Sequence, residues 1–222
     1  MFVRFVMVIA FVVLNPLVER SFAQQEVAVD HAVAPGNRQT VKPVKSDVFL
    51  KIKHIRQKEK LCATASASMA LSHYGVEMDQ VLIKQLAASV SKNPQFVGTY
   101  YVDLVNGLAK KGIHWKRNPH PTTSKGFRTG LKTIRESLFA GCPVLIDTNL
   151  APNGHTMLVN GIDPRRRLIS VIDPNRPAPG QRKYTYNQFE KIWRSKTVNV
   201  RGSILTFPPE KKSGQNENKK SS

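Results

Sequence analysis

The chain has 222 residues, of which 41% are hydrophobic, and its formal net charge is +19. This length accommodates one ordinary domain with tails but not comfortably two, and the hydrophobic fraction excludes disorder throughout. Two cysteines, Cys62 and Cys142, are too few for a disulfide-stapled scaffold.

The first residues have the pattern of a secretory signal peptide over residues 1–23. A short basic start, Met1–Arg4, precedes the apolar run Phe5–Leu14, and Ser21–Ala23 has the small residues of a cleavage site. The apolar run is shorter than the roughly 20 residues that a membrane-spanning helix needs. Two charged residues just before the cleavage site leave an uncleaved, tethered form open. We therefore expect an exported protein, secreted or periplasmic.

The rest of the chain divides into a polar linker or short pro-segment (24–46), a domain (47–207) and a basic, disordered tail (208–222). Apolar spacing and turn residues predict the elements of the domain. In chain order these are helices over 62–74, 78–91, 101–111 and 125–140, strands over 143–146, 156–161 and 168–172, a short helix over 186–193 and a last strand over 202–207. Helices first and an antiparallel sheet second predict an α+β fold.

Cys62 is the candidate nucleophile. It stands at the start of a predicted helix, where the partial positive charge of the helix N-terminus favours a thiolate and lowers the pKa of a cysteine. The alanines that follow it would let this helix pack closely against a sheet. Two alternatives stay open at this point: a buried, inert cysteine, and a disulfide between Cys62 and Cys142.

His155 and Asp173 are the candidate base and its orienting partner. The strands on either side of the turn-like segment 163–167 predict a hairpin, and its arithmetic places Asp173, or its neighbour Pro174, opposite His155. Asp163 is excluded as the partner because eight residues of strand span roughly 26 Å, at about 3.3 Å per residue. Asp147, on a different strand, remains a remote alternative.

Gln57, five residues before Cys62, is the candidate donor to an oxyanion, together with the backbone N–H of Cys62. Taken alone, this spacing is a weak signal, and a surface glutamine is the better interpretation. Other chemistries fit less well, because the chain has no Gly-x-Ser-x-Gly, His-Glu-x-x-His, phosphate-binding loop or Cys-x-x-Cys motif. We expect no cofactor and no metal, since the spacing supplies no further zinc ligands near Cys62 and His155.

Four segments together match one known family. They are Gln57 with Cys62–Leu71 and Tyr74-Gly75, then Gly141–Ile146, then Gly154–Ile162, then Asp173-Pro174-Asn175. In this order they resemble the motifs of the bacteriocin-processing, double-glycine-leader peptidases and their secreted relatives, within the papain-like cysteine peptidase superfamily. The resemblance covers about residues 52–207 and implies a papain-like fold. It also implies that Cys62 attacks a carbonyl, His155 shuttles the proton, Asp173 orients His155 and Gln57 contributes to the oxyanion hole.

The chain departs from the family pattern in three ways. Ala63 stands where the best-known members have a glycine, the spacing from Gln57 to Cys62 is one residue shorter than they often have, and no transporter is joined to the domain. Cleavage of double-glycine leaders is therefore not carried over. The leading expectation is a free-standing, monomeric exported cysteine peptidase that hydrolyses peptide bonds through a thioester intermediate. Within the same chemistry, the substrate is a peptide or protein, or a cell-wall peptide for an amidase or acyltransferase.

A basic stretch, residues 104–135, supports an alternative from another class. It holds eight Lys or Arg and no acidic residue, with Trp115 and Phe127 among them. Such a stretch is more often a solvated face, but it also binds polyanions. The alternative is a non-catalytic protein that binds a polyanionic envelope surface. No motif of a specific nucleic-acid-binding protein is present.

Overall fold

The computed structural model describes residues 47–196 and 198–210. Its elements are β1 (Val48–Phe49), α1 (Cys62–His73), α2 (Gln80–Ala88), α3 (Tyr101–Ala109), β2 (Lys116–Arg117), β3 (His120–Pro121), α4 (Ser124–Phe139), β4 (Val144–Thr148), β5 (His155–Asp163), β6 (Leu168–Ile172), β7 (Gln181–Thr185), α5 (Tyr186–Ile192), β8 (Val200–Arg201) and β9 (Ser203–Leu205). The predicted signal peptide and linker, and residues 211–222 of the predicted tail, lie outside the described residues.

The strands form one main antiparallel sheet in the order β2-β9-β4-β5-β6-β7, and β1 also pairs with β5. A second, two-stranded sheet joins β3 and β8. Four helices, α1 to α4, precede the long strands β4, β5 and β6, and the central hairpin β5–β6 turns at the segment that the sequence indicates. The predicted α+β fold is confirmed.

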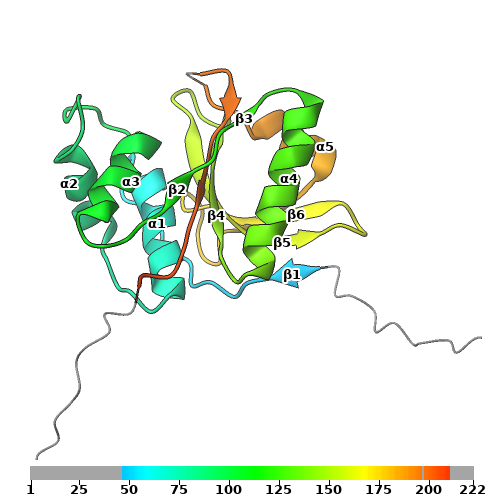
Figure 1. The fold of residues 1–222 in the computed structure, drawn as a ribbon, viewed down its shortest axis with the longest axis horizontal. Coiled ribbons are helices and arrows are strands. Elements are labelled where there is room, and N and C mark those ends of the chain that lie inside the picture. The colour runs from blue at the N-terminus through cyan, green and yellow to red at the C-terminus, as the bar shows by residue number, and fades with distance from the viewer. Residues whose placement is uncertain (1–46, 197, 211–222) are drawn as a thin grey trace, which may run out of the picture. The chain divides into compact units, whose positions relative to one another are not determined.

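Both faces of the sheet are covered by helices. Figure 1 shows α1–α3 on one side of the sheet and α4 and α5 on the other. In β4, Leu145 packs with the buried side chains of α1–α3, whereas Val144 and Ile146 pack with those of α4 and α5. Because alternate residues of a strand point to opposite faces, a strand buried on both faces has an unbroken apolar run. This explains why the central strands were easy to predict.

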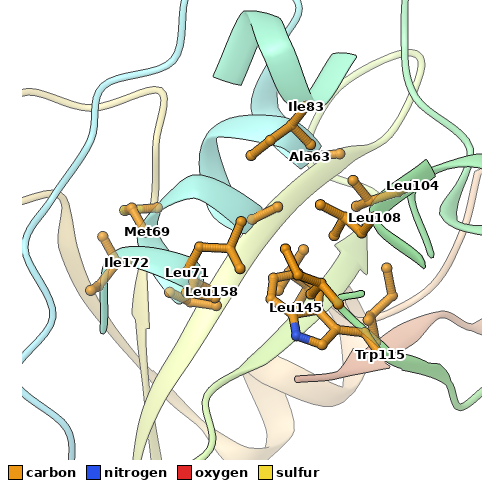
Figure 2. Close-up of a cluster of buried hydrophobic side chains, with 14 residues drawn as sticks. Ala63, Met69, Leu71, Ile83, Leu104, Leu108, Trp115, Leu145, Leu158 and Ile172 are labelled. Carbon is orange, nitrogen blue, oxygen red and sulfur yellow. The ribbon is translucent and has the colours of Figure 1, made fainter. Parts of the chain in front are cut away.

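Helix α1 lies close against β5 because its side chains are small. Residues 63–71 are all buried, and Ala65, Ala67 and Ala70 expose 0% of their surface. Figure 2 shows Leu71 of α1 beside Leu158 of β5, in the core shared with α2 and α3. The N-terminal end of α1 therefore lies next to the first residues of β5.

The shorter and more polar elements differ from the sequence expectation. Strand β7 was not predicted, because Gln-Arg-Lys-Tyr-Thr has one buried residue, Tyr184, and no apolar run. The predicted strand 202–207 is shorter, and β1, β2, β3 and β8 are too short to show a period. In the part of the chain that the structure describes, no helix is long and apolar enough to span a membrane.

Candidate active site

Cys62 is the first residue of α1. The residue before it, Leu61, places no side-chain cap on the helix, so the first backbone N–H groups remain available to other acceptors. The preceding turn contains Lys60 in the left-handed region (φ 58°), which reverses the chain just before the helix starts. Hydrogen bonding from the backbone of Thr156 on β5 and of Ala63 acts to lower the pKa of the Cys62 thiol. The local fold thus surrounds the sulfur of Cys62 with donors.

His155 is the first residue of β5 and is 8% exposed. The hydroxyl of Thr148, its partner on β4, donates to the His155 carbonyl at 2.8 Å and fixes the backbone there. Gly154 precedes it with φ +82°, a conformation that glycine adopts without strain. The histidine is therefore held at the N-terminal end of the central strand β5.

Asp173 follows β6 directly and is 4% exposed. Its Oδ1 lies 2.7 Å from Nε2 of His155 and accepts the backbone N–H of Asn175 at 3.0 Å. Its Oδ2 lies 3.5 Å from the guanidinium of Arg182. Since Nε2 is bound to Asp173, the other ring nitrogen, Nδ1, is the one that can meet the thiol of Cys62, with which the ring hydrogen-bonds. The structure thus brings Cys62, His155 and Asp173 together.

The hairpin register differs from the predicted one. The last strand pair is Leu158 with Ile172, so one further step would put Asp173 opposite Met157 rather than His155. The pairing shifts at Asn160, which lies in a bulge of β5, and the turn is tighter than expected. Because the offset from His155 is two residues, both side chains still point to one face, and Asp173 reaches His155 as a diagonal neighbour.

The pKa values of Cys62, His155 and Asp173 are all shifted in the direction that favours the charged form of each group. Burial acts to raise the pKa of Cys62, but the hydrogen bonds from His155 and Thr156 outweigh it and lower the pKa. Burial acts to lower the pKa of His155, but the hydrogen bonds with Asp173 and Cys62 raise it to about 9. Burial likewise opposes ionisation of Asp173, yet its contact with His155 lowers its pKa. At neutral pH these directions favour a thiolate beside an imidazolium.

The backbone of Gln57 contacts the residue that follows Asp173. Its N–H donates to the carbonyl of Pro174 at 2.8 Å, which ties the segment before α1 to the loop after Asp173. The side chain of Gln80 forms two hydrogen bonds with the same segment: it accepts the N–H of Lys58 and donates to the carbonyl of Arg56. The amide oxygen of Gln57 is buried without a hydrogen-bond partner among the described residues. Donation from this amide to an oxyanion stays a prediction.

Asp163 and Asp147, the two other carboxylates considered as partners of His155, lie elsewhere in the sheet. Asp163 accepts the N–H of Arg166 at 3.0 Å and belongs to the turn of the hairpin. Asp147 stands on β4 directly opposite Thr156, and its charge interacts with that of His155. The carboxylate that hydrogen-bonds the imidazole is that of Asp173.

Cys62 and Cys142 are both free. Cys142 interacts with Tyr74, which caps the C-terminal end of α1, whereas Cys62 begins that helix. Twelve helical residues span about 18 Å at 1.5 Å per residue, and a disulfide requires Cα atoms within about 7 Å. This geometry argues against the bridge that the sequence left open.

Several residues near the group were not found by sequence reasoning. Tyr101 of α3 donates to the hydroxyl of Thr156 at 3.4 Å and interacts electrostatically with Cys62. Arg182 lies on the unpredicted strand β7, and Gln80 on α2 acts from a distance in sequence. No local motif marks these residues. Among the described residues, no three His, Cys, Asp or Glu side chains gather as metal ligands would.

Comparison with known proteins identifies the family and the fold. The model of the peptidase C39-like family matches residues 49–198. The crystal structure of a double glycine motif protease from an AMS/PCAT transporter, in complex with the leader peptide, is 21% identical, with a TM-score of 0.51. That match covers 73% of this chain and 95% of the protease. No curated protein matches the chain.

Two further solved structures are similar. The peptidase domain of Streptococcus ComA, a bi-functional ABC transporter involved in a quorum sensing pathway, is 16% identical, with a TM-score of 0.49 and coverage of 71% of this chain and 98% of the domain. UfSP from C. elegans is 11% identical, with a TM-score of 0.52, and the match covers 78% of this chain and 36% of UfSP. The fold is that of C39 peptidase domains, which is papain-like, and the chain belongs to the peptidase C39-like family.

Proposed function

We propose that this protein is an exported cysteine peptidase in which Cys62 is the nucleophile, His155 the general acid and base, and Asp173 the residue that orients His155. One observation carries the proposal: Nε2 of His155 lies 2.7 Å from Oδ1 of Asp173, and the same imidazole interacts with the thiol of Cys62, which raises its pKa. Export rests on the sequence of residues 1–23.

The reaction follows from this arrangement. The thiolate of Cys62 attacks the substrate carbonyl carbon, and the resulting oxyanion is received by the backbone N–H of Cys62 and the amide of Gln57. The imidazolium of His155 gives its proton to the leaving amine as the C–N bond breaks, which leaves a thioester. His155 then removes a proton from water, the water oxygen attacks the thioester, and the released thiolate regenerates the ion pair.

The decisive experiment follows alkylation of Cys62 by iodoacetamide, together with cleavage of a mixed peptide library, as a function of pH. We expect rapid alkylation below the pH at which an ordinary cysteine reacts, because hydrogen bonds lower the pKa of Cys62. Cleavage should rise with pH as the thiol ionises. It should fall again near pH 9 as His155, whose pKa is about 9, loses the proton that the leaving amine requires.

Cys142 serves as the internal control for this experiment, because it is buried (7% exposed) and should not react. Loss of cleavage in proportion to alkylation of Cys62, located by peptide mapping, supports the proposal. Full cleavage by the protein alkylated at Cys62 contradicts it.

The substrate of the proposed reaction is a peptide. The double glycine motif protease of similar fold was crystallised in complex with the leader peptide, and this supports a peptide as the ligand. An amide in a cell-wall peptide, or transfer of the acyl group to an amine in place of water, uses the same thioester. Comparing wall fragments with unmodified peptides as substrates separates these cases.

A second candidate function, binding to a polyanionic envelope surface, is favoured by the surface of α4. Four cations follow one another at helical spacing on its solvent face, and all are exposed: Lys125, Arg128, Lys132 and Arg135. We call this set the α4 stripe. One member, Lys132, has a weak ion pair with Glu136 at 3.9 Å. The opposite side of α4 is buried against the sheet.

Neutralising the α4 stripe with glutamine is expected to weaken binding to heparin and to flatten its salt dependence. The slope of log affinity against log salt should fall by up to about one unit per lost contact, by analogy with phosphate contacts in nucleic acids. Cys62→Ala should leave this binding unchanged. Absence of heparin binding by the unaltered protein at low salt would end this candidate.

A further inference from the structure

Asp147 is a carboxylate next to the proposed reaction centre that the mechanism above does not use. It lies on β4 directly opposite Thr156 of β5, whose backbone hydrogen bonding acts to lower the pKa of Cys62. Directly paired residues on antiparallel strands have Cα atoms about 4.5–5.5 Å apart and side chains on the same face. Tyr101, which donates to the hydroxyl of Thr156, interacts electrostatically with both Asp147 and Cys62. The carboxylate and the thiol therefore both act on the same tyrosine hydroxyl.

Glycines on both neighbouring segments let the backbone come close to Asp147. A Cβ on Gly154, just before His155, would lie 3.1 Å from Oδ1 of Asp147. A Cβ on Gly202 would lie 3.1 Å from the Cβ of Asp147. The carboxylate is held from the side by a hydrogen bond with Ser195 and remains partly exposed. It is fixed in position without being covered.

Asp147 forms no ion pair with a Lys or Arg among the described residues. The whole chain has 34 Lys and Arg against 15 Asp and Glu, so counter-ions are plentiful. Yet among residues 47–196 and 198–210, no Lys or Arg comes within 4.0 Å of this carboxylate. The positive group whose charge acts on Asp147 is His155, which already hydrogen-bonds Asp173. Burial raises the pKa of Asp147 to about 6, so the group is still mostly ionised at neutral pH.

We propose that Asp147 is a specificity-determining residue that binds a cationic nitrogen of the substrate close to the scissile bond. The cation is an α-ammonium group or the side chain of a Lys, Arg or related diamino acid, which share the same chemistry. The inference rests on the proposed function, because it gives the substrate class of that site. A half-buried carboxylate without a counter-ion gains most from a ligand that supplies both a charge and N–H donors.

The proposal runs against the overall charge of the protein. A chain of net charge +19 attracts anionic ligands over long distances. Beside the thiolate, however, Asp147 would reject an anionic side chain and select a cationic one. The preference should therefore be confined to one or two substrate positions, and it should persist in salt because the group is partly buried.

The test measures binding to the Cys62→Ala protein, which holds peptides without cleaving them. Titration calorimetry compares peptides that differ only by Arg against citrulline at each position, and by a free against an acetylated N-terminus. Both pairs remove one positive charge, the Arg and citrulline pair with almost no change of shape, and the two arms distinguish a side chain from an α-ammonium group as the source of the cation. The same peptides are then titrated into Cys62→Ala proteins that also carry Asp147→Asn or, as a charge-matched control, Asp163→Asn.

We expect at least one cationic peptide to bind roughly tenfold more tightly than its neutral partner, as a charge-assisted hydrogen bond predicts. This ratio should approach one with Asp147→Asn and should be unchanged with Asp163→Asn. Equal binding of every pair, a ratio that survives Asp147→Asn, or no binding of any peptide would overturn the inference. Cleavage of peptides by the unaltered protein is read separately, so this inference and the proposed peptidase activity can fail independently.

Discussion

Replacement of Cys62 with alanine is expected to abolish peptide hydrolysis, with a loss of about 10⁵-fold or more in kcat. This is the size of effect seen when the nucleophile of a catalytic triad is removed. The physical reason is that no other group of the proposed site can form the thioester, since His155 transfers protons and Asp173 orients the ring of His155. The measurement is turnover of a peptide that the unaltered protein cleaves. Unchanged turnover by the Cys62→Ala protein would contradict the peptidase mechanism.

Cys142→Ala is the matched control for this experiment. Cys142 is buried and lies near the C-terminal end of α1, so its loss should leave turnover unchanged while lowering stability by about 1 kcal/mol. Cys62 begins α1 and is only partly buried, so its replacement should leave thermal unfolding nearly unchanged. The two substitutions therefore separate loss of chemistry from loss of fold.

The order of the longer elements could be predicted because each has its own pattern. The helix expected over 62–74 is α1 (Cys62–His73), and the hairpin expected around 163–167 turns there. Strand β7 could not be predicted, since its pairing with β6 supplies the order that its own polar residues do not. Elements of two residues leave no period in a sequence at all.

For the site, nearness in sequence decided what could be predicted. His155 and Asp173 are joined by one hairpin, so their contact could be expected even though the bulge at Asn160 shifts the register. The approach of Cys62 to His155 depends on how α1 packs on β5, across more than 90 residues of chain. No local rule gives that distance, and the expectation rested on resemblance to a family.

The same limit explains why Asp147 had little weight in the sequence. A carboxylate on a neighbouring strand was a remote candidate to orient His155, and the structure gives the hydrogen bond to Asp173 instead. What the sequence could not show is that Asp147 is paired with Thr156 and interacts with Tyr101, with no Lys or Arg among the described residues within 4.0 Å. Its significance comes from that combination of position and charge.

Asp173→Ala is expected to lower kcat by about 10²–10⁴-fold, the range that general acid–base catalysis contributes. Without the 2.7 Å contact to Oδ1, the ring of His155 is free to turn away from Cys62 and its imidazolium loses a negative partner. The side chain of Arg182 and the N–H of Asn175 would lose their acceptor as well, at a cost to stability of about 1–3 kcal/mol. Turnover should therefore be measured well below the unfolding temperature of the variant.

Asp173→Asn separates orientation from charge at the same position. The amide oxygen can still accept from Nε2 of His155, so the ring should keep its place and kcat should fall much less than with alanine. The loss of negative charge should lower the pKa of His155 from about 9, because contact with Asp173 is part of what raises it. The alkaline decline of kcat should then move to lower pH. Asp163→Asn, in the turn of the same hairpin, should move neither kcat nor this decline, and an unchanged profile for Asp173→Asn would show that Asp173 does not set the charge state of His155.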